Sequence, residues 1–277
     1  MITLKSYAKI NLGLEVLGKR NDGFHDILSI LCKIDLFDLL HYKNSNKNMV
    51  IQDGIKEEEN IVFKVLNYMT QKFKITQKLN ITIEKNIPYS SGMGGGSSNA
   101  ANAIDGISKI LNLNLDSKEK FDIALKFGSD IPFFLSKGTA IISGRGDKIS
   151  FINSPKNKHI VVFYPKYELK DKTKTIFNSV TSYTNGNKQK SLLSKINNND
   201  YLYGPFFNGL ETAAIENFSN FNLIKNNLTN FGISDISMTG SGPTFYSLQN
   251  SDEGAKEIKN KVDNSDLDLK TFKAKII

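Results

Sequence analysis

The segment that most constrains this chain is a run of glycines and serines between a strand-like stretch and a helix-like stretch. Before it, Leu79, Ile81 and Ile83 alternate with polar residues, and after it the apolar residues of 100–111 follow one helical face. Glycine lets backbone N–H groups approach a bulky anion, and the first turn of a helix carries partial positive charge. We therefore predict that the loop 88–98 cradles a polyphosphate. The full run reads Pro88-Tyr89-Ser90-Ser91-Gly92-Met93-Gly94-Gly95-Gly96-Ser97-Ser98-Asn99-Ala100-Ala101.

Two familiar phosphate-binding patterns do not match this loop. No Gly-Lys-Ser/Thr follows the glycines, as a Walker loop requires. Counted from Gly92 and Gly94, the third glycine of a dinucleotide fingerprint would fall at Ser97. A flexible loop or a tight start of a helix is the alternative, but so many glycines cost conformational entropy on folding. Phosphate binding is therefore the favoured interpretation, with the hydroxyl of Ser97 or Ser98 as a candidate to touch a phosphate-bound Mg²⁺.

A second glycine-rich turn covers residues 238–244, between two strand-like segments. By itself, this turn is best explained as a β-turn in which glycines supply positive φ angles. Together with the first loop, it could brace the phosphate site or contact a substrate. Its sequence is Met238-Thr239-Gly240-Ser241-Gly242-Pro243-Thr244.

Three further positions carry groups suited to chemistry, although each has an ordinary structural explanation. Asp130 sits among apolar residues, which favours a shifted pKa and a general base, but a helix-end turn residue is the simpler alternative. Lys9 begins an alternating strand, and in a lysine-rich chain a lone lysine is usually solvated. In the turn 22–25, Phe24 could stack on a base and His25 could bond its edge, or the two could simply pack.

The net charge of +8 is weak support for a nucleic-acid partner. Of the 36 basic residues only Arg20 and Arg145 are arginines, and arginine is the residue that reads and stacks on bases. Cys32 is the single cysteine, which excludes a disulfide framework and a cysteine-built zinc site and favours a buried thiol. The chain shows no signal-peptide pattern at its start and no apolar run of about 18 residues. We expect a soluble cytoplasmic protein.

The remaining pattern predicts mixed α+β structure in both halves, with a domain boundary near residue 155 in the polar stretch 144–158. The predicted domains are 1–155 and 156–277. Residues 26–40 are apolar and ambiguous between strand and helix, and 44–48 is a polar loop. Predicted strands lie at 10–16, 79–83, 139–143, 159–164, 233–238, 244–248 and 272–276. Predicted helices begin at 61, capped by Asn60, and at 117, capped by Asp116, and cover 100–111, 174–183, 207–218, 221–231 and a stretch from 252.

Taken in chain order, these segments resemble the GHMP kinase family from residue 8 to residue 244. The glycine loop and the turn 238–244 are typical of the whole family. The start of the chain is specific for the branch that acts on a cytidine-diphosphate substrate, because the Ala-Lys-Ile-Asn and Asp-Gly-Phe-His motifs occur together. The other matching segments are Ala8-Lys9-Ile10-Asn11-Leu12, Gly18-Lys19-Arg20, Asp22-Gly23-Phe24-His25 and Gly128-Ser129-Asp130-Ile131-Pro132.

The resemblance implies a two-domain α+β fold with the active site in the cleft between the domains. It implies an enzyme that uses ATP and Mg²⁺ to phosphorylate the 2-hydroxyl of a methylerythritol group carried on cytidine diphosphate, in non-mevalonate isoprenoid (terpenoid) precursor biosynthesis. The partner would be this small-molecule substrate, with no nucleic acid and no membrane, and the protein would be a monomer or homodimer.

The resemblance also implies roles for individual residues. Asp130 matches the catalytic base, which would take the proton of the attacking hydroxyl, and Lys9 matches the catalytic lysine, which would hold Asp130 and the hydroxyl and offset negative charge. The predicted ATP-binding set is Asn60, near the adenine, with Pro88, Tyr89, Ser90, Ser91, Gly92, Met93, Gly94, Gly95, Gly96, Ser97 and Ser98. The predicted substrate-binding set is Asn11, Phe24, His25, Gly240, Ser241 and Gly242. The metal ligands are not predicted.

The chain departs from the family pattern at a few positions. Phe24 stands where Tyr is usual, which keeps ring stacking and removes a phenol hydrogen bond. Met93 replaces the more usual Leu, a tolerated exchange. The segment 166–176 matches only loosely and yields no predicted site residue.

Two other functions remain as alternatives. Another small-alcohol kinase of the family, of the homoserine or mevalonate type, would have no need of the pair Phe24 and His25 for a cytosine. A non-catalytic nucleotide-binding or nucleic-acid-binding protein would fit the charge, but the scarcity of arginine and the segment around Asp130 count against it.

Overall fold

The structure, a computed structural model, describes residues 1–136, 138–166 and 171–277. Within it the chain forms two compact units, each built from separate stretches of sequence. Unit 1 comprises Met1–Ala8, Leu36–Tyr89 and Gly94–Lys137, and unit 2 comprises Lys9–Asp35, Ser90–Met93 and Gly138–Ile277. The long strands β1 (Ile2–Lys19) and β2 (His25–Ser45) contribute residues to both units. The linear domains 1–155 and 156–277 stay a prediction.

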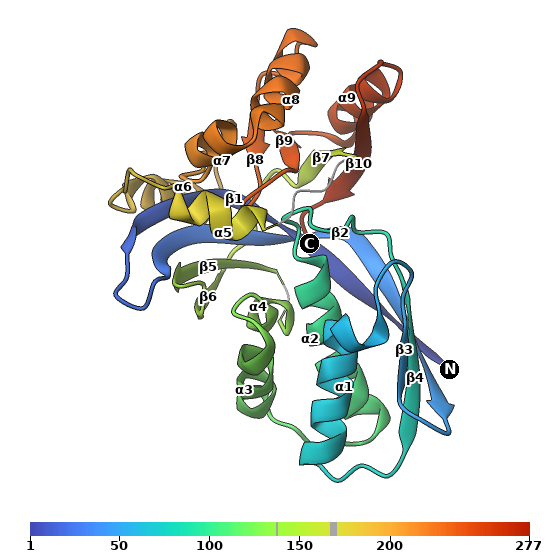
Figure 1. Ribbon diagram of the computed structural model, residues 1–277. Helices are drawn as coiled ribbons and strands as arrows, with labels where there is room; N and C mark the ends of the chain where they lie inside the picture. The colour runs from blue at the N-terminus through green and yellow to red at the C-terminus, as the bar shows by residue number, and fades with distance from the viewer. Residues whose placement is uncertain (137, 167–170) are drawn as a thin grey trace. The chain divides into compact units, whose positions relative to one another are not determined.

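Unit 1 combines a sheet with a group of helices. The strand β4 (Lys78–Glu84) pairs antiparallel with the C-terminal part of β2 and parallel with β3 (Met49–Ile51). Its alternating residues Leu79, Ile81 and Ile83 are buried, which confirms the strand predicted from their spacing. The helices α1 (Ile61–Lys72) and α2 (Gly95–Ile110) lie side by side (Figure 1). The other helical elements of this unit are η1 (Glu57–Glu59), α3 (Ser117–Phe127) and α4 (Ile131–Phe134).

The starts of the helices in unit 1 follow their sequence signals. The Asn60 side chain accepts a hydrogen bond from the Val62 N–H at 2.9 Å and caps α1. Asp116 and Glu119 bond each other's backbone N–H groups, so the predicted capping box of α3 is confirmed. Gly106, in α2, permits close packing on β2, because a Cβ there would lie 2.6 Å from the Tyr42 hydroxyl oxygen.

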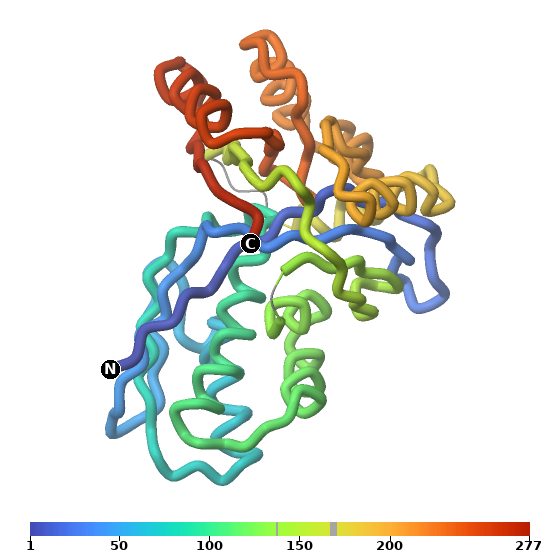
Figure 2. Tube along the Cα trace, turned by 180° about the vertical axis from the view of Figure 1, so that it is seen from behind, coloured from blue at the N-terminus to red at the C-terminus, as the bar shows by residue number. Residues whose placement is uncertain are grey.

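Unit 2 contains an antiparallel sheet in the order β10 (Leu269–Lys275), β7 (His159–Pro165), β9 (Phe245–Gln249), β8 (Ile236–Met238). Figure 2 shows the last strand of the chain running beside β7. In the same unit, β5 (Thr139–Gly144) pairs with β6 (Lys148–Ile152) and with the N-terminal part of β2. The segment 26–40, ambiguous from sequence, is therefore strand.

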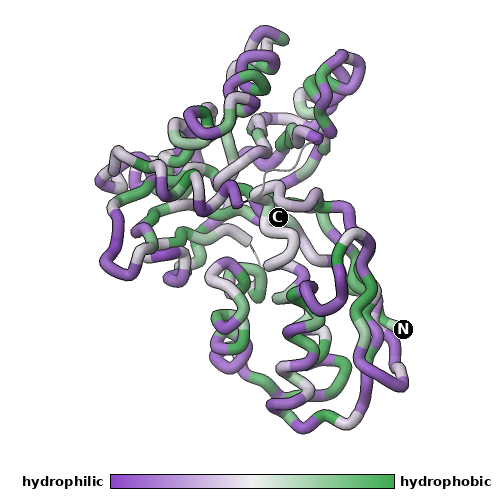
Figure 3. The backbone as a smooth tube through the Cα atoms, viewed as in Figure 1, coloured by the Kyte–Doolittle hydropathy of each residue, from purple (hydrophilic) through white to green (hydrophobic). Residues whose placement is uncertain are grey.

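Four helices of unit 2 contribute residues to an apolar core: α5 (Lys172–Asn178), α7 (Glu211–Asn217), α8 (Ser219–Asn230) and α9 (Asp252–Asp263). The helix α6 (Asn187–Asn197) belongs to the same unit. Residues of β1, β7, β8 and β9 meet residues of α5, α7, α8 and α9 in this core, including Val16, Phe163, Phe221 and Phe245. Hydrophobic and hydrophilic segments alternate along these helices (Figure 3), as expected when one face of a helix is buried.

Several predicted boundaries are wrong. The helix α2 begins at Gly95, so the last four positions of the predicted loop 88–98 are helical. The strand β6 lies inside the polar stretch 144–158, for which no strand was predicted, and the polar helix α6 was not predicted. The helices predicted over 174–183 and 207–218 are shorter, as α5 and α7, because irregular chain follows α5 and precedes α7.

The predicted α+β class is confirmed, and so is the burial of the single cysteine. Burial raises the pKa of the Cys32 thiol to about 12, which keeps it protonated and unreactive. Among residues 1–136, 138–166 and 171–277, no helix is long and apolar enough to cross a membrane.

Candidate functional site

The strand β1 places Lys9 and Asn11 in the interior of unit 2. Both side chains are buried, with Lys9 5% exposed and Asn11 3% exposed. The Lys9 ammonium donates to Asn11 Oδ1 at 2.6 Å, and Asn11 Nδ2 donates to Ser29 Oγ at 2.8 Å. Ser29 Oγ in turn donates to the Gly13 carbonyl at 2.6 Å. This chain of hydrogen bonds fixes the amide of Asn11 so that its oxygen faces Lys9.

The turn 238–244 packs directly on these two residues. The Asn11 N–H donates to Thr239 Oγ1 at 2.9 Å. A Cβ at Gly240 would lie 3.4 Å from Lys9 Nζ and 3.4 Å from Asn11 Oδ1, so the glycine lets the backbone approach the lysine closely. Gly240 and Gly242 have φ angles of 57° and 66°, which confirms that the glycines supply positive φ in this turn.

The middle of the glycine loop, residues 90–93, joins the same cluster in unit 2. The Lys9 N–H donates to the Met93 carbonyl at 3.0 Å. Gly92 has a φ of 78°, and a Cβ there would lie 2.9 Å from the carbonyl oxygens of both Thr239 and Gly242. Ser91 and Met93 are buried, whereas Ser90 is exposed with a φ of 50°. The structure therefore brings together three motifs that are far apart in the sequence.

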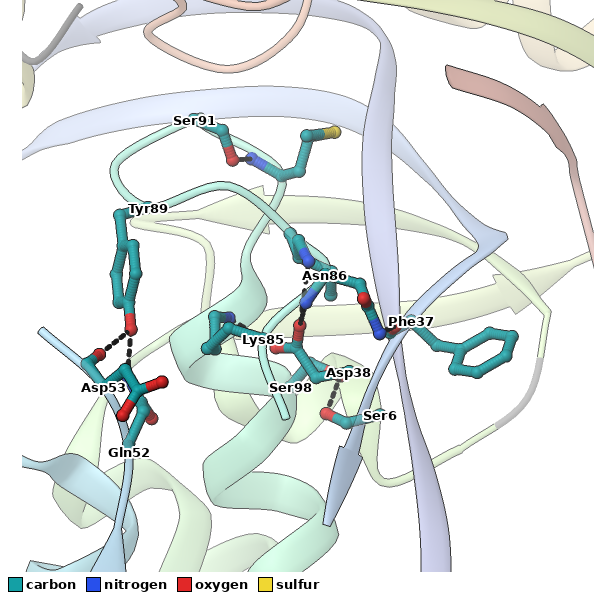
Figure 4. Close-up of polar contacts among 12 residues, drawn as sticks. Ser6, Phe37, Asp38, Gln52, Asp53, Lys85, Asn86, Tyr89, Ser91 and Ser98 are labelled. Carbon is teal, nitrogen blue, oxygen red and sulfur yellow. Dashed lines mark hydrogen bonds and ion pairs between the residues drawn. The ribbon is translucent and has the colours of Figure 1, made fainter. Parts of the chain in front are cut away.

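The start of the glycine loop is anchored in unit 1 by a buried carboxylate, which sequence reasoning missed. Asp38, fully buried on β2, accepts hydrogen bonds from the N–H groups of Asn86 and Ile87, each at 2.8 Å, and pairs with the Lys85 ammonium. Figure 4 shows Lys85 and Asn86 converging on this carboxylate. No sequence motif marks Asp38, because its partners lie 47–49 positions away along the chain.

The helix start after the loop is shaped by three glycines and two serines in unit 1. Gly94 has a φ of 71°, which favours glycine, and a Cβ at Gly95 would lie 3.0 Å from the Ile87 side chain, so the chain is tightly packed there. Gly96 is exposed and Ser97 is half-buried, whereas Ser98 is buried and accepts a hydrogen bond from Ser6 Oγ at 2.8 Å. Of the two serine side chains, Ser97 is the more exposed.

Tyr89 and Asn60 belong to one hydrogen-bond network in unit 1. The Tyr89 hydroxyl donates to the Asp53 carbonyl and accepts from Gln52 Nε2 at 2.9 Å, as Figure 4 shows. Asn60 Nδ2 donates to Gln52 Oε1 at 3.1 Å, in addition to its capping bond. Pro88, next to Tyr89, is half-buried. Proximity of Asn60 to an adenine stays a prediction.

Asp130 is half-buried and lies directly before α4 in unit 1. The residues of α4 that follow it, Ile131–Phe134, are all buried. Asp130 therefore lies next to apolar residues, as its sequence context predicts. Its role as a base stays a prediction.

His25 lies in an aromatic cluster in unit 2. Its ring centroid is 5.4 Å from that of Phe177 and 6.3 Å from that of Tyr183. Burial, and secondly the charge of Lys19, lower the pKa of the imidazole, so it is mainly neutral at pH 7 with one N–H donor and one acceptor. A neutral donor–acceptor ring can pair with the polar edge of a pyrimidine. Phe177 and Tyr183 were not predicted as site residues, because both lie beyond the loosely matching segment 166–176 and in none of the matched motifs.

The neighbouring Phe24 lies on the exposed side of the turn that precedes β2. It is 55% exposed, and the guanidinium of Arg145 lies 5.5 Å from its ring centroid. Arg20 fixes the turn by pairing with Asp22 at 3.0 Å and Asp26 at 2.9 Å. The exposed ring remains suited to stacking.

Three further polar residues of unit 2 surround the turn 238–244 and were also missed. Lys172, on α5, donates to Ser241 Oγ at 3.3 Å, and Thr173 Oγ1 lies 2.8 Å from the same hydroxyl. Asn208 Nδ2 donates to the carbonyls of Met238 and Gly240, both at 2.9 Å. Residues 167–170, within the loosely matching segment, lie outside the described residues. In a chain so rich in lysine and asparagine, nothing in the local sequence distinguishes these side chains.

The described part of the chain contains no group of three or more His, Cys, Asp and Glu side chains that could hold a metal ion. Mg²⁺ in phosphoryl-transfer sites takes one or two protein ligands together with phosphate oxygens and waters. The residues present therefore fit a Mg²⁺ that arrives with a nucleotide and do not fit a metal held by the protein alone.

Comparison with known proteins shows that this chain is similar to kinases over most of its length. The family described as "GHMP kinases N terminal domain" matches residues 60–138. A protein of Thermoanaerobacter sp. (strain X514) named "4-diphosphocytidyl-2-C-methyl-D-erythritol kinase" is 34% identical over 254 residues, covering 89% of this chain and 87% of that protein. A protein of the same name from Thermodesulfovibrio yellowstonii is 33% identical over 269 residues and covers 93% of both chains.

Solved structures show the same fold. A crystal structure of 4-(cytidine 5'-diphospho)-2C-methyl-D-erythritol kinase aligns with a TM-score of 0.86 at 23% identity, covering 99% of each chain. A homoserine kinase from Cytophaga hutchinsonii aligns with a TM-score of 0.73 at 16% identity, covering 99% of this chain and 95% of that chain.

Proposed function

Since relatives at about one-third identity match nearly the whole chain, it belongs to the GHMP kinase family, in the branch of the 4-diphosphocytidyl-2-C-methyl-D-erythritol kinases, and we propose that it carries out this reaction. The reaction transfers the γ-phosphoryl group of ATP to the 2-hydroxyl of 4-diphosphocytidyl-2-C-methyl-D-erythritol. The product would serve the synthesis of isoprenoid precursors.

The observation that carries this proposal is the meeting of three motifs around Lys9. The turn 238–244 contributes Gly240, the glycine loop contributes Gly92 and β1 contributes Asn11. A Cβ at Gly240 would lie 3.4 Å from Lys9 Nζ, from Asn11 Oδ1 and from the Gly92 carbonyl oxygen alike. Such close backbone packing around a buried ammonium suits a site that positions an anionic group for transfer.

In the proposed mechanism, Asp130 accepts the proton of the substrate hydroxyl as that oxygen attacks the γ-phosphorus. Lys9, oriented by Asn11, offsets the negative charge that develops at the reacting oxygens. The backbone around Gly94–Ser97 and the start of α2 hold the ATP phosphates, so that positioning and electrostatics supply most of the rate. Neutral His25 and Phe24 hold the cytosine, with Phe177 and Tyr183 completing the aromatic subsite.

A Mg²⁺ that arrives with ATP would reduce the negative charge of the phosphates. We propose that the Ser97 hydroxyl is the protein group that contacts it, because Ser98 is buried and bonded to Ser6. The function of the loop otherwise depends on backbone N–H groups.

The decisive experiment is transfer of radiolabelled phosphate from ATP to a panel of alcohols. The panel contains 4-diphosphocytidyl-2-C-methyl-D-erythritol, homoserine and mevalonate. We expect transfer to the cytidylyl substrate alone. Transfer to homoserine or mevalonate with none to the cytidylyl compound would contradict the proposal.

The mechanism is tested by Asp130→Asn and Lys9→Met, with Asp122→Asn as the matched control. Asp122 is exposed on α3, so its loss should leave turnover within about twofold. Removal of the base should lower kcat by about 10²- to 10⁴-fold with little change in the KM for ATP. Near-normal kcat in Asp130→Asn would show that another group accepts the proton.

A further inference from the structure

Lys172 is a buried lysine that the proposed mechanism does not use. It is 6% exposed, and its ammonium donates to Ser241 Oγ at 3.3 Å. No carboxylate of the described residues forms an ion pair with it. An ammonium has three N–H donors, so one neutral hydroxyl leaves most of its hydrogen-bonding capacity for other acceptors. A charge removed from water in this way is costly unless an anion compensates for it.

The position of Lys172 brings it close to Lys9, another buried lysine of unit 2. Ser241 contacts Lys172, and the adjacent Gly240 packs against the Lys9 ammonium, so two successive residues of one turn touch the two cations. Burial, and secondly the charge of Lys9, lower the pKa of Lys172 to about 8. Lys172 is thus still mainly protonated at pH 7, and its ammonium group and that of Lys9 repel each other electrostatically. The pair favours a group with more than one negative charge.

The helix α5 also connects this cation to the aromatic subsite. Phe177, five positions after Lys172 on α5, contacts the His25 ring. At 1.5 Å of rise per residue, the two positions are separated by about 7.5 Å along the helix axis. A ligand with its base at His25 and Phe177 would therefore extend its phosphates along α5 toward Lys172, Ser241 and Lys9.

We propose that Lys172, together with Ser241, binds the diphosphate of the cytidine-bearing substrate and places that substrate beside Lys9. This inference rests on the proposed function, and it assigns Lys172 to the acceptor substrate and not to ATP. Lys172 is a binding and positioning residue, and it takes no part in proton transfer.

The test compares Lys172→Met with Lys174→Met, which removes an exposed lysine two positions further along the same helix. Calorimetry measures the binding of CDP and of cytidine to wild type and to both variants. Loss of a hydrogen bond to a charged group should weaken CDP binding by about 10- to 100-fold in Lys172→Met. Cytidine binding in that variant, and both affinities in Lys174→Met, should stay within about twofold of wild type.

Kinetics separate the two phosphate-bearing ligands. In Lys172→Met the KM for the cytidylyl substrate should rise by the same factor as the Kd for CDP, with the KM for ATP within about twofold. Lys172→Arg, which keeps the charge, should recover part of the CDP affinity. Methionine is close in length to lysine and removes a buried charge, so the fold should persist, which urea unfolding verifies.

Three results would overturn the inference: CDP affinity unchanged in Lys172→Met, cytidine affinity lost to the same extent as CDP affinity, or a rise in the KM for ATP alone. Those results would leave the proposed function standing. A wild-type protein that binds neither CDP nor cytidine would overturn both.

Discussion

Replacement of Asp38 should destabilise the anchor of the glycine loop, and the structure allows us to estimate the resulting loss of unfolding free energy. The carboxylate is fully buried and accepts from Lys85, from the Asn86 N–H and from the Ile87 N–H. In Asp38→Ala all three donors lose their acceptor, and the Lys85 ammonium, with a side chain 12% exposed, loses its counter-charge. Breaking a buried pair from one side typically costs about 3–5 kcal/mol of unfolding free energy.

The loss of unfolding free energy in Asp38→Ala depends on the unpaired Lys85 charge as well as on the lost hydrogen bonds. The double variant Asp38→Ala with Lys85→Met removes both charges, so it should be less destabilised than the sum of the single variants. Asp38→Asn keeps one oxygen for the two backbone N–H groups but turns an amide donor toward Lys85. We expect its loss to lie between those of the alanine variant and the double variant.

Urea unfolding measures these differences, and Asp105→Ala is the matched control. Asp105 pairs with Lys120 at 2.9 Å, but its side chain is 42% exposed, so its loss should change the unfolding free energy by less than about 1 kcal/mol. The KM for ATP should rise in Asp38→Ala, because Asn86 and Ile87 lead directly into the loop. An unfolding free energy in Asp38→Ala within about 1 kcal/mol of wild type would refute the reasoning.

Three further outcomes follow from single residues. Gly92→Ala should lower the unfolding free energy, measured by urea unfolding, by about 2 kcal/mol or more, because the φ of 78° strains a residue with a Cβ and that Cβ would lie 2.9 Å from two backbone oxygens. Gly96→Ala should raise the unfolding free energy slightly, because its Cβ would point into open space. Asn60→Ala should lower the free energy of unfolding, measured by thermal or urea unfolding, by about 1 kcal/mol, because α1 loses its N-cap. Folding lowers the pKa of Lys172 from 10.5 to about 8. Between pH 8 and pH 10.5 the unfolded chain therefore binds more protons than the folded chain, so the unfolding free energy should rise with pH over this range by up to about 3 kcal/mol. Urea unfolding at several pH values should show this rise in wild type and not in Lys172→Met.

The sequence predicted features that depend on neighbours along the chain. Asn60 and Asp116 are caps because they precede their helices, and the alternation of Leu79, Ile81 and Ile83 is a local pattern that burial on one face explains. The start of α2 at Gly95 was missed because three successive glycines give no helical signal, although Ile87 and Lys85 pack closely against that position.

The residues of the candidate site also fall into those that local sequence predicts and those that only distant contacts reveal. Lys9, Asn11 and Gly240 could be named because they lie in motifs of the family, and the structure brings them together. Asp38 and Lys172 could not be named, because an aspartate on an apolar strand and one lysine among many show their role only through distant partners. Contacts between residues far apart in sequence leave no periodic trace in either segment.

The division of the chain into interleaved units has a consequence for synthesis on the ribosome. Unit 1 needs no residue beyond 137, so its segments are all available when half of the chain has been made. Unit 2 needs 9–35 from the start, and its sheet is complete only when β10 pairs with β7 and Ile276 bridges Ile34. The half of β1 that carries Lys9 therefore waits, without its final neighbours, until the last strand emerges. A stop codon a few residues early would spare unit 1 and leave the strand that carries Lys9 in an incomplete unit.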